Sequence, residues 1–168
     1  MRLVMWPTDR WAAYSTPMPV ELTPAGTRGA PNWQPPAWLK GLVGLAQPLF
    51  DLAMGRRMRL LKLTTVGARS GNEHRVSLFC APAGPDAWYV VASAGGAIKH
   101  PAWYYNMARN PDRIWIELDG RRVRVAAATV TGAERDAAWR AFVAKWPGYA
   151  DYQARTDRVI PVVKLTPV

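Results

Sequence analysis

The chain has 168 residues, of which 49% are hydrophobic, and this length and composition fit one globular domain with a sizeable core and some extra chain. Its single cysteine excludes an intrachain disulfide and a cysteine metal cluster, and the two histidines show no metal-ligand spacing, so we expect no bound metal. The formal net charge of +10, mostly from arginine, indicates an anionic partner: a phosphorylated or polycarboxylate cofactor, nucleic acid, or an anionic membrane surface.

Residues 1–35 are predicted to form an irregular N-terminal arm, because prolines and glycines interrupt them too often for regular structure. The arm carries Trp6, Trp11, Tyr14 and Trp33, which are not typical of a disordered tail. Packing over the domain or a pocket and a loose terminus are therefore both open. The sequence shows no signal peptide and no apolar run of transmembrane length, so we expect a cytoplasmic protein.

Residues 36–57 predict a leading helix, the first part of a domain that spans residues 36–168. Apolar residues between Trp38 and Ala53 recur at spacings of three and four, Pro48 interrupts them, and basic residues follow. Such a helix can pack on the core, cover a pocket or lie on a membrane surface. We favour core packing and leave peripheral membrane association open.

A strand over residues 59–65 and a return strand over residues 76–81 are predicted next, joined by a glycine-flanked loop. The loop reads Gly67-Ala68-Arg69-Ser70-Gly71, and His74 and Arg75 follow it. Backbone amides, a hydroxyl and guanidinium groups in this arrangement can hold an anion. The Gly-Lys-Ser/Thr ending of a Walker A loop is absent, and a simple hairpin turn is the alternative.

A strand over residues 88–93 leads into the densest group of candidate residues, Ser93 to Asn110. The chain turns at Gly95-Gly96, and Pro101 suits the first turn of a short helix. Backbone amides at such a turn can approach an anion closely. The aromatic run Trp103-Tyr104-Tyr105 beside it can serve the core or stack on a planar ligand.

The remaining elements are mostly antiparallel strands. Residues 113–118 pair with residues 121–130 across Asp119-Gly120, which is typical of a type I′ turn. A helix follows to Lys145, residues 146–152 are interpreted as turns, and residues 159–165 form a closing strand. Consecutive hairpins without β-α-β units predict an α+β fold, mainly antiparallel β, built as a small barrel with packed helices.

Four ordered blocks between residues 61 and 168 carry a family resemblance. They are Thr64-Thr65-x-Gly67-x-Arg69-Ser70-Gly71, Val90-Val91-Ala92-Ser93-x-Gly95-Gly96, Lys99-His100-Pro101-Ala102-Trp103-Tyr104-x-Asn106 with Asn110-Pro111, and Pro147-Gly148-Tyr149-x-Asp151-Tyr152-Gln153-x-x-Thr156-Asp157-Arg158-x-Ile160-Pro161. With these blocks the chain resembles the deazaflavin-dependent nitroreductase family, actinobacterial split β-barrel enzymes of the FMN-binding split-barrel type that use coenzyme F420.

The resemblance implies roles for individual residues. The phosphate and acidic tail of the cofactor would be bound by the glycine-flanked loop and flanked by the return strand: Ala68, Arg69, Ser70, Gly71, His74, Arg75 and Phe79. The deazaflavin ring would be held by a strand end and a helix start: Val91, Ala92, Ser93, Ala94, Ala102, Trp103, Tyr104, Tyr105 and Asn106. Tyr149 and Tyr152 match positions on the substrate side, and Tyr152, Tyr149 or water would return a proton.

The resemblance also implies an activity, namely hydride transfer from reduced F420 to an activated double bond, a nitroaromatic or a quinone-type acceptor. The substrate would be small and hydrophobic or aromatic, and a homodimer stays open. One alternative is a split-barrel oxidoreductase that binds FMN, and another is an F420-binding protein without catalysis. We expect no nucleic acid partner, because no known nucleic-acid motif is present.

Overall fold

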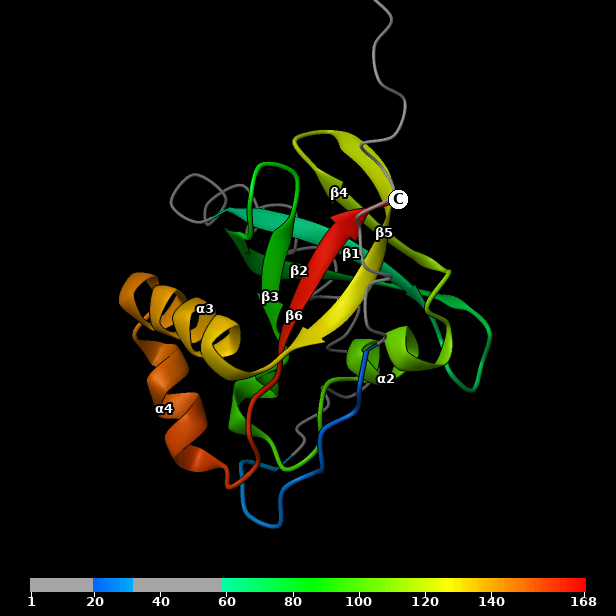
Figure 1. The fold of residues 1–168 in the computed structure, drawn as a ribbon. Helices are drawn as coiled ribbons and strands as arrows, with labels where there is room; N and C mark the ends of the chain where they lie inside the picture. Colours follow the sequence, from blue (N-terminus) through cyan, green and yellow to red (C-terminus); the bar gives the residue numbers. More distant parts are fainter. Residues whose placement is uncertain (1–19, 32–58) are drawn as a thin grey trace, which may run out of the picture.

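The computed structural model describes residues 20–31 and 59–168. Within these residues, antiparallel strands close into a barrel in the order β1-β2-β3-β6-β5-β4 (Figure 1). The strands are β1 (Leu60–Val66), β2 (Glu73–Pro82), β3 (Trp88–Val91), β4 (Ile114–Leu118), β5 (Arg121–Val130) and β6 (Val162–Pro167). The helices are the short 3-10 helix η1 (Ala94–Gly96) and the α-helices α2 (Ala102–Arg109), α3 (Gly132–Lys145) and α4 (Gly148–Arg155).

The predicted antiparallel barrel with packed helices is confirmed. The helix predicted over residues 36–57 lies outside the described residues, and so does its proposed membrane role. The same holds for four aromatic residues of the N-terminal arm: Trp6, Trp11, Tyr14 and Trp33. In the part of the chain that the structure describes, no helix has the length and apolar character needed to cross a bilayer.

Two long strands allow the barrel to close. β2 pairs with β1 through residues 73–79 and with β3 through residues 80–82. β5 pairs in the same way with β4 through residues 121–124 and with β6 through residues 125–130. Each long strand therefore serves two neighbours in succession, which turns the sheet at two corners and leaves no unpaired edge.

The β4–β5 turn has the conformation that its sequence predicts. Asp119 and Gly120 both have positive φ, at 53° and 77°, as a type I′ turn requires. Beyond the turn, Arg122 and Arg124 are exposed while Val125 is buried, so this part of the strand has a basic and an apolar face.

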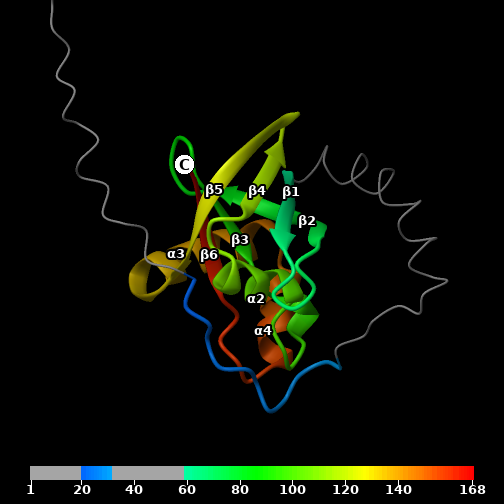
Figure 2. The same ribbon diagram turned by 90° about the vertical axis from the view of Figure 1, so that its right-hand side faces the viewer.

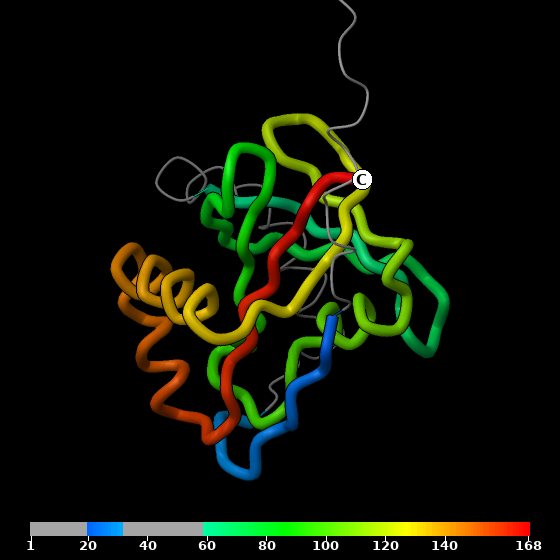
Figure 3. The backbone as a smooth tube through the Cα atoms, viewed as in Figure 1, coloured from blue at the N-terminus to red at the C-terminus, as the bar shows by residue number. Residues whose placement is uncertain are grey.

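Two hydrophobic clusters hold the domain together. The first fills the barrel and extends onto α2, with Leu63, Ile116 and Leu165 fully buried beside Trp103 and Met107. The second lies between the barrel wall and the helices α3 and α4, which pack together on one side of the barrel (Figure 3). Helix α2 instead lies at one end of the barrel, so the helices flank the strands without interrupting them (Figure 1).

The interpretation of residues 146–152 as turns is wrong, since α4 spans most of them. Pro147 stands at the N-cap of this helix and Gly148 begins it. The helix is stabilised by tertiary contacts: the ring of Tyr149 packs edge-on against Phe142 at 5.5 Å and against Trp139 at 6.2 Å. Burial of aromatic side chains outweighs the weak helix propensity of this stretch.

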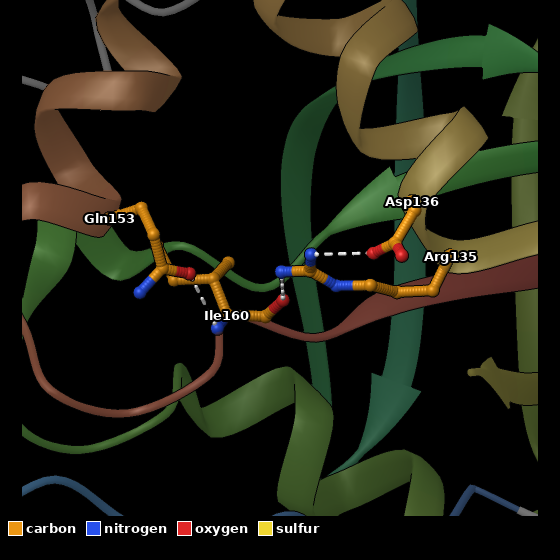
Figure 4. A network of polar contacts seen from close by, with 4 residues as sticks. All are labelled: Arg135, Asp136, Gln153 and Ile160. Carbon is orange, nitrogen blue, oxygen red and sulfur yellow. Dashed lines mark hydrogen bonds and ion pairs between the residues drawn. The ribbon is translucent and has the colours of Figure 1, made fainter. Parts of the chain in front are cut away.

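A polar network attaches α4 to the following segment (Figure 4). Gln153 accepts a hydrogen bond from the amide of Ile160 at 3.1 Å and donates one to the carbonyl of Arg158 at 2.8 Å. From α3, Arg135 donates to the carbonyl of Ile160 at 3.2 Å and pairs with Asp136 at 3.3 Å. The segment between α4 and β6 is therefore held from both helices.

Several strand bounds differ from the sequence prediction, and the largest differences concern β2, β3, which ends at Val91, and β6. β2 begins at Glu73, earlier than predicted, because Glu73 pairs with Val66 and the hairpin extends to the loop. His74 and Arg75 consequently lie on the strand. β6 begins at Val162, later than predicted, and the preceding Pro161 only accepts a hydrogen bond from the amide of Ala92 at 2.9 Å.

Residues 20–31 form an extended segment that we call the strap. It crosses the end of the barrel where α2 and α4 also lie, as both views show (Figures 1 and 2). The amide of Gly26 donates to the carbonyl of Ile98, and the amide of Ala30 donates to the carbonyl of Gly96, each at 2.9 Å. The described part of the arm therefore packs against the domain.

Candidate functional site

The described part of the chain forms a pocket of about 960 Å³ between the strap, the β1–β2 loop, the start of β2 and α2. This volume suits a ligand of cofactor size. Its wall is made by Leu22, Ala25, Thr65, Gly67, Ala68, Arg69, Ser70, His74, Arg75, Val76, Lys99, Ala102, Trp103, Tyr105, Asn106 and Arg109.

The pocket wall is strongly cationic. Arg69, Arg75, Lys99 and Arg109 all line it, and the described residues of the wall include neither aspartate nor glutamate. Outside the wall, Glu73 lies 3.5 Å from one guanidinium nitrogen of Arg75, and both side chains are exposed. Guanidinium groups recognise phosphate and carboxylate with paired hydrogen bonds, so this wall is suited to a ligand with several negative charges.

The β1–β2 loop is fixed in place by two asparagines of the α2 region. Asn106 is buried; its Oδ1 accepts from the amide of Ala68 at 2.9 Å, and its Nδ2 donates to Oγ1 of Thr65 at 3.1 Å. Asn110 donates to the carbonyl of Val66 at 3.0 Å. Helix α2 thus sets the position of the loop that carries Arg69.

Several loop amides are used inside the protein. The amide of Ala68 binds Asn106, the amide of Gly71 donates to the carbonyl of Gly67 at 3.0 Å, and the amide of Asn72 donates to Oγ of Ser70 at 3.3 Å. The loop therefore presents the side chains of Arg69 and Ser70 to a ligand rather than these amides. Nε2 of His74 lies 3.3 Å from Oγ of Ser70.

The predicted ring-binding residues separate into two groups, and the first lies on α2. Ala102, Trp103, Tyr105 and Asn106 line the pocket. Tyr104 does not line it, because its ring is fully buried and its hydroxyl donates to the carbonyl of Glu21 at 2.6 Å. Tyr104 therefore anchors the strap to the core.

The second group, Val91 to Ala94, lies at the end of β3 and the start of η1, outside the pocket wall. A buried arginine that sequence reasoning did not select holds this turn. Arg158 is 3% exposed, and its guanidinium donates to the carbonyls of Ala92, Ser93 and Ala97 at 3.3, 2.6 and 2.7 Å. Burial lowers the pKa of Arg158, and these carbonyls solvate its charge in place of water.

His100 connects this arginine to the strap. Nη1 of Arg158 lies 3.0 Å from Nδ1 of His100, and Nε2 of His100 lies 2.9 Å from the carbonyl of Thr23. A guanidinium only donates, so Nδ1 accepts and the proton of a neutral imidazole resides on Nε2. Burial, followed by the positive charge of Arg158, lowers the pKa of His100.

The two tyrosines predicted for the substrate side, Tyr149 and Tyr152, lie on α4. They belong to the second hydrophobic cluster, between the barrel wall and the helices α3 and α4. Tyr149 is 8% exposed, and burial raises its pKa above the usual value for tyrosine. Tyr152 is half-buried, with its ring centroid 5.6 Å from that of Tyr149. Phe79 stacks on Trp146 at 5.3 Å in the same cluster. These residues and Gly71 are not part of the pocket wall.

The pocket also contains residues that were not selected as binding residues from the sequence. Lys99 precedes α2, Arg109 is its last residue, and Leu22 and Ala25 come from the strap. Lys99 belongs to a block that carried the family resemblance, and Arg109 occupies the last turn of the predicted short helix. The strap residues had no signal in the sequence, because their contact with the pocket depends on tertiary structure.

A model of the F420H(2)-dependent quinone reductase family matches residues 50–167. An F420H(2)-dependent quinone reductase of Mycobacterium tuberculosis is 39% identical over 109 residues, which cover 63% of this chain and 72% of that protein. Among solved structures, the F420-H2 dependent reductase FDR-A superposes with a TM-score of 0.56 at 36% identity, covering 64% of this chain and 93% of that one.

Two further solved structures are similar. One, described as a domain-swapped dimer, has a TM-score of 0.56 at 29% identity and covers 74% of this chain and 98% of its own. HutZ, the heme storage protein of Vibrio cholerae, has a TM-score of 0.50 at 12% identity and covers 73% of this chain and 89% of its own. The likeness to HutZ concerns the fold alone.

Proposed function

Because the chain belongs to the F420H(2)-dependent quinone reductase family, we propose that it reduces a quinone with electrons from reduced coenzyme F420. Family membership makes the protein an oxidoreductase that uses F420, and the expected family, split-barrel fold and cofactor are confirmed. The acceptor and the residues that serve it are the proposal.

The observation that carries the proposal is the charge of the pocket wall. The phosphate and acidic tail of F420 require several cationic donors, and Arg69, Arg75, Lys99 and Arg109 line one pocket with no carboxylate among the wall residues that the structure describes. Tyr105 in the same wall is only half-buried and offers an aromatic surface suited to a planar ring. The residues present therefore fit the cofactor, with Arg69 and Ser70 as proposed tail ligands.

When bound, reduced F420 supplies a hydride for transfer to the acceptor. A quinone that accepts a hydride also needs one proton to become the hydroquinone. The protein must orient the acceptor, exclude water and return this proton. In this account no metal or carboxylate pair is needed.

Both tyrosines lie outside the pocket wall, so their place beside the acceptor rests on the family resemblance. Between the two, we propose that Tyr152 returns the proton in preference to Tyr149. Tyr152 is half-buried and therefore able to exchange protons with water, whereas Tyr149 is buried with a raised pKa. A raised pKa makes the phenol a poorer proton donor near neutral pH. Nitroaromatics and activated double bonds need the same hydride and proton, so we propose them as further acceptors.

The proposal is tested by following the absorbance of reduced F420 under anaerobic conditions after a quinone is added. We expect protein-dependent oxidation with saturation in both reactants. A nitroaromatic and an activated enone serve as parallel acceptors, and reduced FMN replaces reduced F420 as the control donor. Oxidation of reduced F420 at the uncatalysed rate with every acceptor would contradict the proposal and favour cofactor binding without catalysis.

The assembly state is a separate proposal. A similar protein is described as a domain-swapped dimer, which supports a homodimer for this chain. Multi-angle light scattering of the full chain decides this: the mass of a dimer supports the proposal, and the mass of a monomer over the working concentration range contradicts it.

A further inference from the structure

We propose that the strap is the specificity wall of the pocket, in which Leu22 selects acceptors with an apolar substituent and Asp157 positions the strap. This inference rests on the proposed function, because it assigns the substrate class of the same pocket. It concerns residues outside the cationic wall that the cofactor tail would use.

Leu22 is placed to contact a ligand. It is one of the few large hydrophobic side chains exposed in the described part of the chain, at 49%, and it lines the pocket together with Ala25. The strap contributes no charged side chain to the wall. An exposed leucine in a pocket gains free energy when an apolar ligand group covers it.

The two ends of α2 give the pocket two chemically different ends. The carbonyl of Thr23 binds His100, which precedes α2, so the strap meets the N-terminal end of the helix. The loop that carries Arg69 is instead braced by Asn106 and Asn110, in the second half of the helix and directly after it. Lys99 also lies at the N-terminal end of α2, whereas Arg69, Arg75 and Arg109 line the rest of the described wall. An anionic tail held by these three arginines thus leaves the strap end, with Leu22 and Ala25, for the acceptor.

Asp157 holds the strap from outside the pocket. Its carboxylate accepts hydrogen bonds from the amide of Thr27 at 2.9 and 3.2 Å, from the amide of Arg28 at 3.0 Å and from the hydroxyl of Thr27. Oγ1 of Thr156 adds a hydrogen bond to the carbonyl of Arg28 at 3.0 Å. Neither Asp157 nor Thr27 lines the pocket, so Asp157 is a positioning residue.

The first test compares Leu22→Ala with Val159→Ala, a matched control at another exposed aliphatic residue outside the pocket wall. Binding of tetramethylbenzoquinone and of a fully substituted benzoquinone with one long alkyl chain is measured by isothermal titration calorimetry on the full chain with F420 bound. Leu22→Ala should weaken binding of the alkyl quinone about four- to fifteenfold, which corresponds to the loss of one to two buried methylene contacts. Binding of the tetramethyl compound and of F420 should stay within about twofold.

The second test compares Asp157→Ala with Asp151→Ala, an exposed aspartate on α4 that makes no contact with the strap in the described structure. Trypsin cleavage after Arg28, followed by mass spectrometry, reports strap release without any turnover. Asp157→Ala should speed this cleavage at least about tenfold, as loss of several charge-assisted hydrogen bonds implies. It should also raise KM for the alkyl quinone more than it changes kcat, and Asp157→Glu should restore part of both.

The outcomes separate this inference from the proposed function. The strap assignment would be overturned if Leu22→Ala weakened binding of both quinones equally. It would also be overturned if trypsin cleaved Asp157→Ala no faster than the parent protein. Either result would count even if the parent reduces quinones rapidly. If the parent protein reduces no quinone but still binds the alkyl quinone in a Leu22-dependent way, the proposed function is overturned. The assignment of the strap as the specificity wall then still holds.

Discussion

The guanidinium of Arg158 donates a hydrogen bond to Nδ1 of His100 at 3.0 Å, and both side chains are 3% exposed. The same guanidinium binds the turn after β3, and the same imidazole binds the strap. One pair of side chains thus connects two segments that are distant in sequence, and it requires a neutral histidine.

Acidification should therefore destabilise the protein below about pH 6.5, the usual pKa of histidine. The pKa of His100 is lowered in the folded protein, so the unfolded chain takes up this proton first as pH falls. The free energy of unfolding should decrease by at most about 1.4 kcal/mol per pH unit between this value and the folded-state pKa. Urea unfolding at several pH values measures the slope.

The control for this prediction is the other histidine. His100→Gln should lose the slope between about pH 5 and 6.5, whereas His74→Gln, at an exposed position, should keep it. A parent protein with the same unfolding free energy at pH 7.5 and 5.5 would contradict the neutral state of His100.

Asn106→Ala should impair both stability and cofactor binding. The substitution leaves the amide of Ala68 and the buried hydroxyl of Thr65 without their partner, which costs about 1–3 kcal/mol. The loop with Arg69 then loses its fixed position, so the affinity for F420 should fall. Asn110→Ala, which removes one hydrogen bond to Val66, is the control and should affect affinity less. Unchanged F420 affinity in Asn106→Ala would show that the hydrogen bonds of Asn106 to Ala68 and Thr65 do not affect cofactor binding.

Gly29→Ala should detach the strap, because the two backbones approach closely there. A Cβ at position 29 would lie 2.8 Å from both the carbonyl oxygen of Gly96 and the amide nitrogen of Ile98. At Gly148 a Cβ would meet no atom within 4 Å, so Gly148→Ala is the matched control. Trypsin cleavage after Arg28 should accelerate only in Gly29→Ala. Equal cleavage of both variants would argue against the observed packing of the strap.

Tyr152→Phe should lower kcat more than Tyr149→Phe does. Loss of a positioned proton donor typically costs about a hundredfold or more in rate, and return of the proton by water would reduce that loss. Tyr149 packs in the second hydrophobic cluster, where its Phe variant keeps the ring contacts. Anaerobic steady-state rates with one quinone decide the order. If Tyr149→Phe is the slower variant, the assignment of the donor is reversed.

The strands could be predicted from the sequence because they are short runs rich in apolar residues, separated by strong turn signals. The hairpin across Asp119 and Gly120 is the clearest case, since its bounds depend on local chemistry. Helix α4 could not be predicted, because its formation depends on Tyr149 packing against α3 and on Gln153 binding the segment that follows.

Part of the candidate site could also be predicted from the sequence. The family blocks identified Arg69, Ser70 and Trp103, all of which line the pocket. They did not distinguish Tyr104, whose ring is buried in the core, from its neighbour Tyr105, which lines the pocket. The roles of Arg158 and Leu22 depend on contacts between distant segments, and the sequence alone offers no means to separate a buried arginine from the other cations.

The most direct test of the account is a fluorescence titration of the full chain with F420, with FMN as the parallel ligand. We predict saturable F420 binding that Arg69→Ala and Arg109→Ala each weaken about tenfold, as loss of one charge-assisted contact implies, and much weaker FMN binding. Arg121→Ala, at an exposed position outside the pocket wall, should bind like the parent. Affinity for F420 that is independent of both pocket arginines, or preference for FMN, would contradict the assignment of this pocket to the F420 tail.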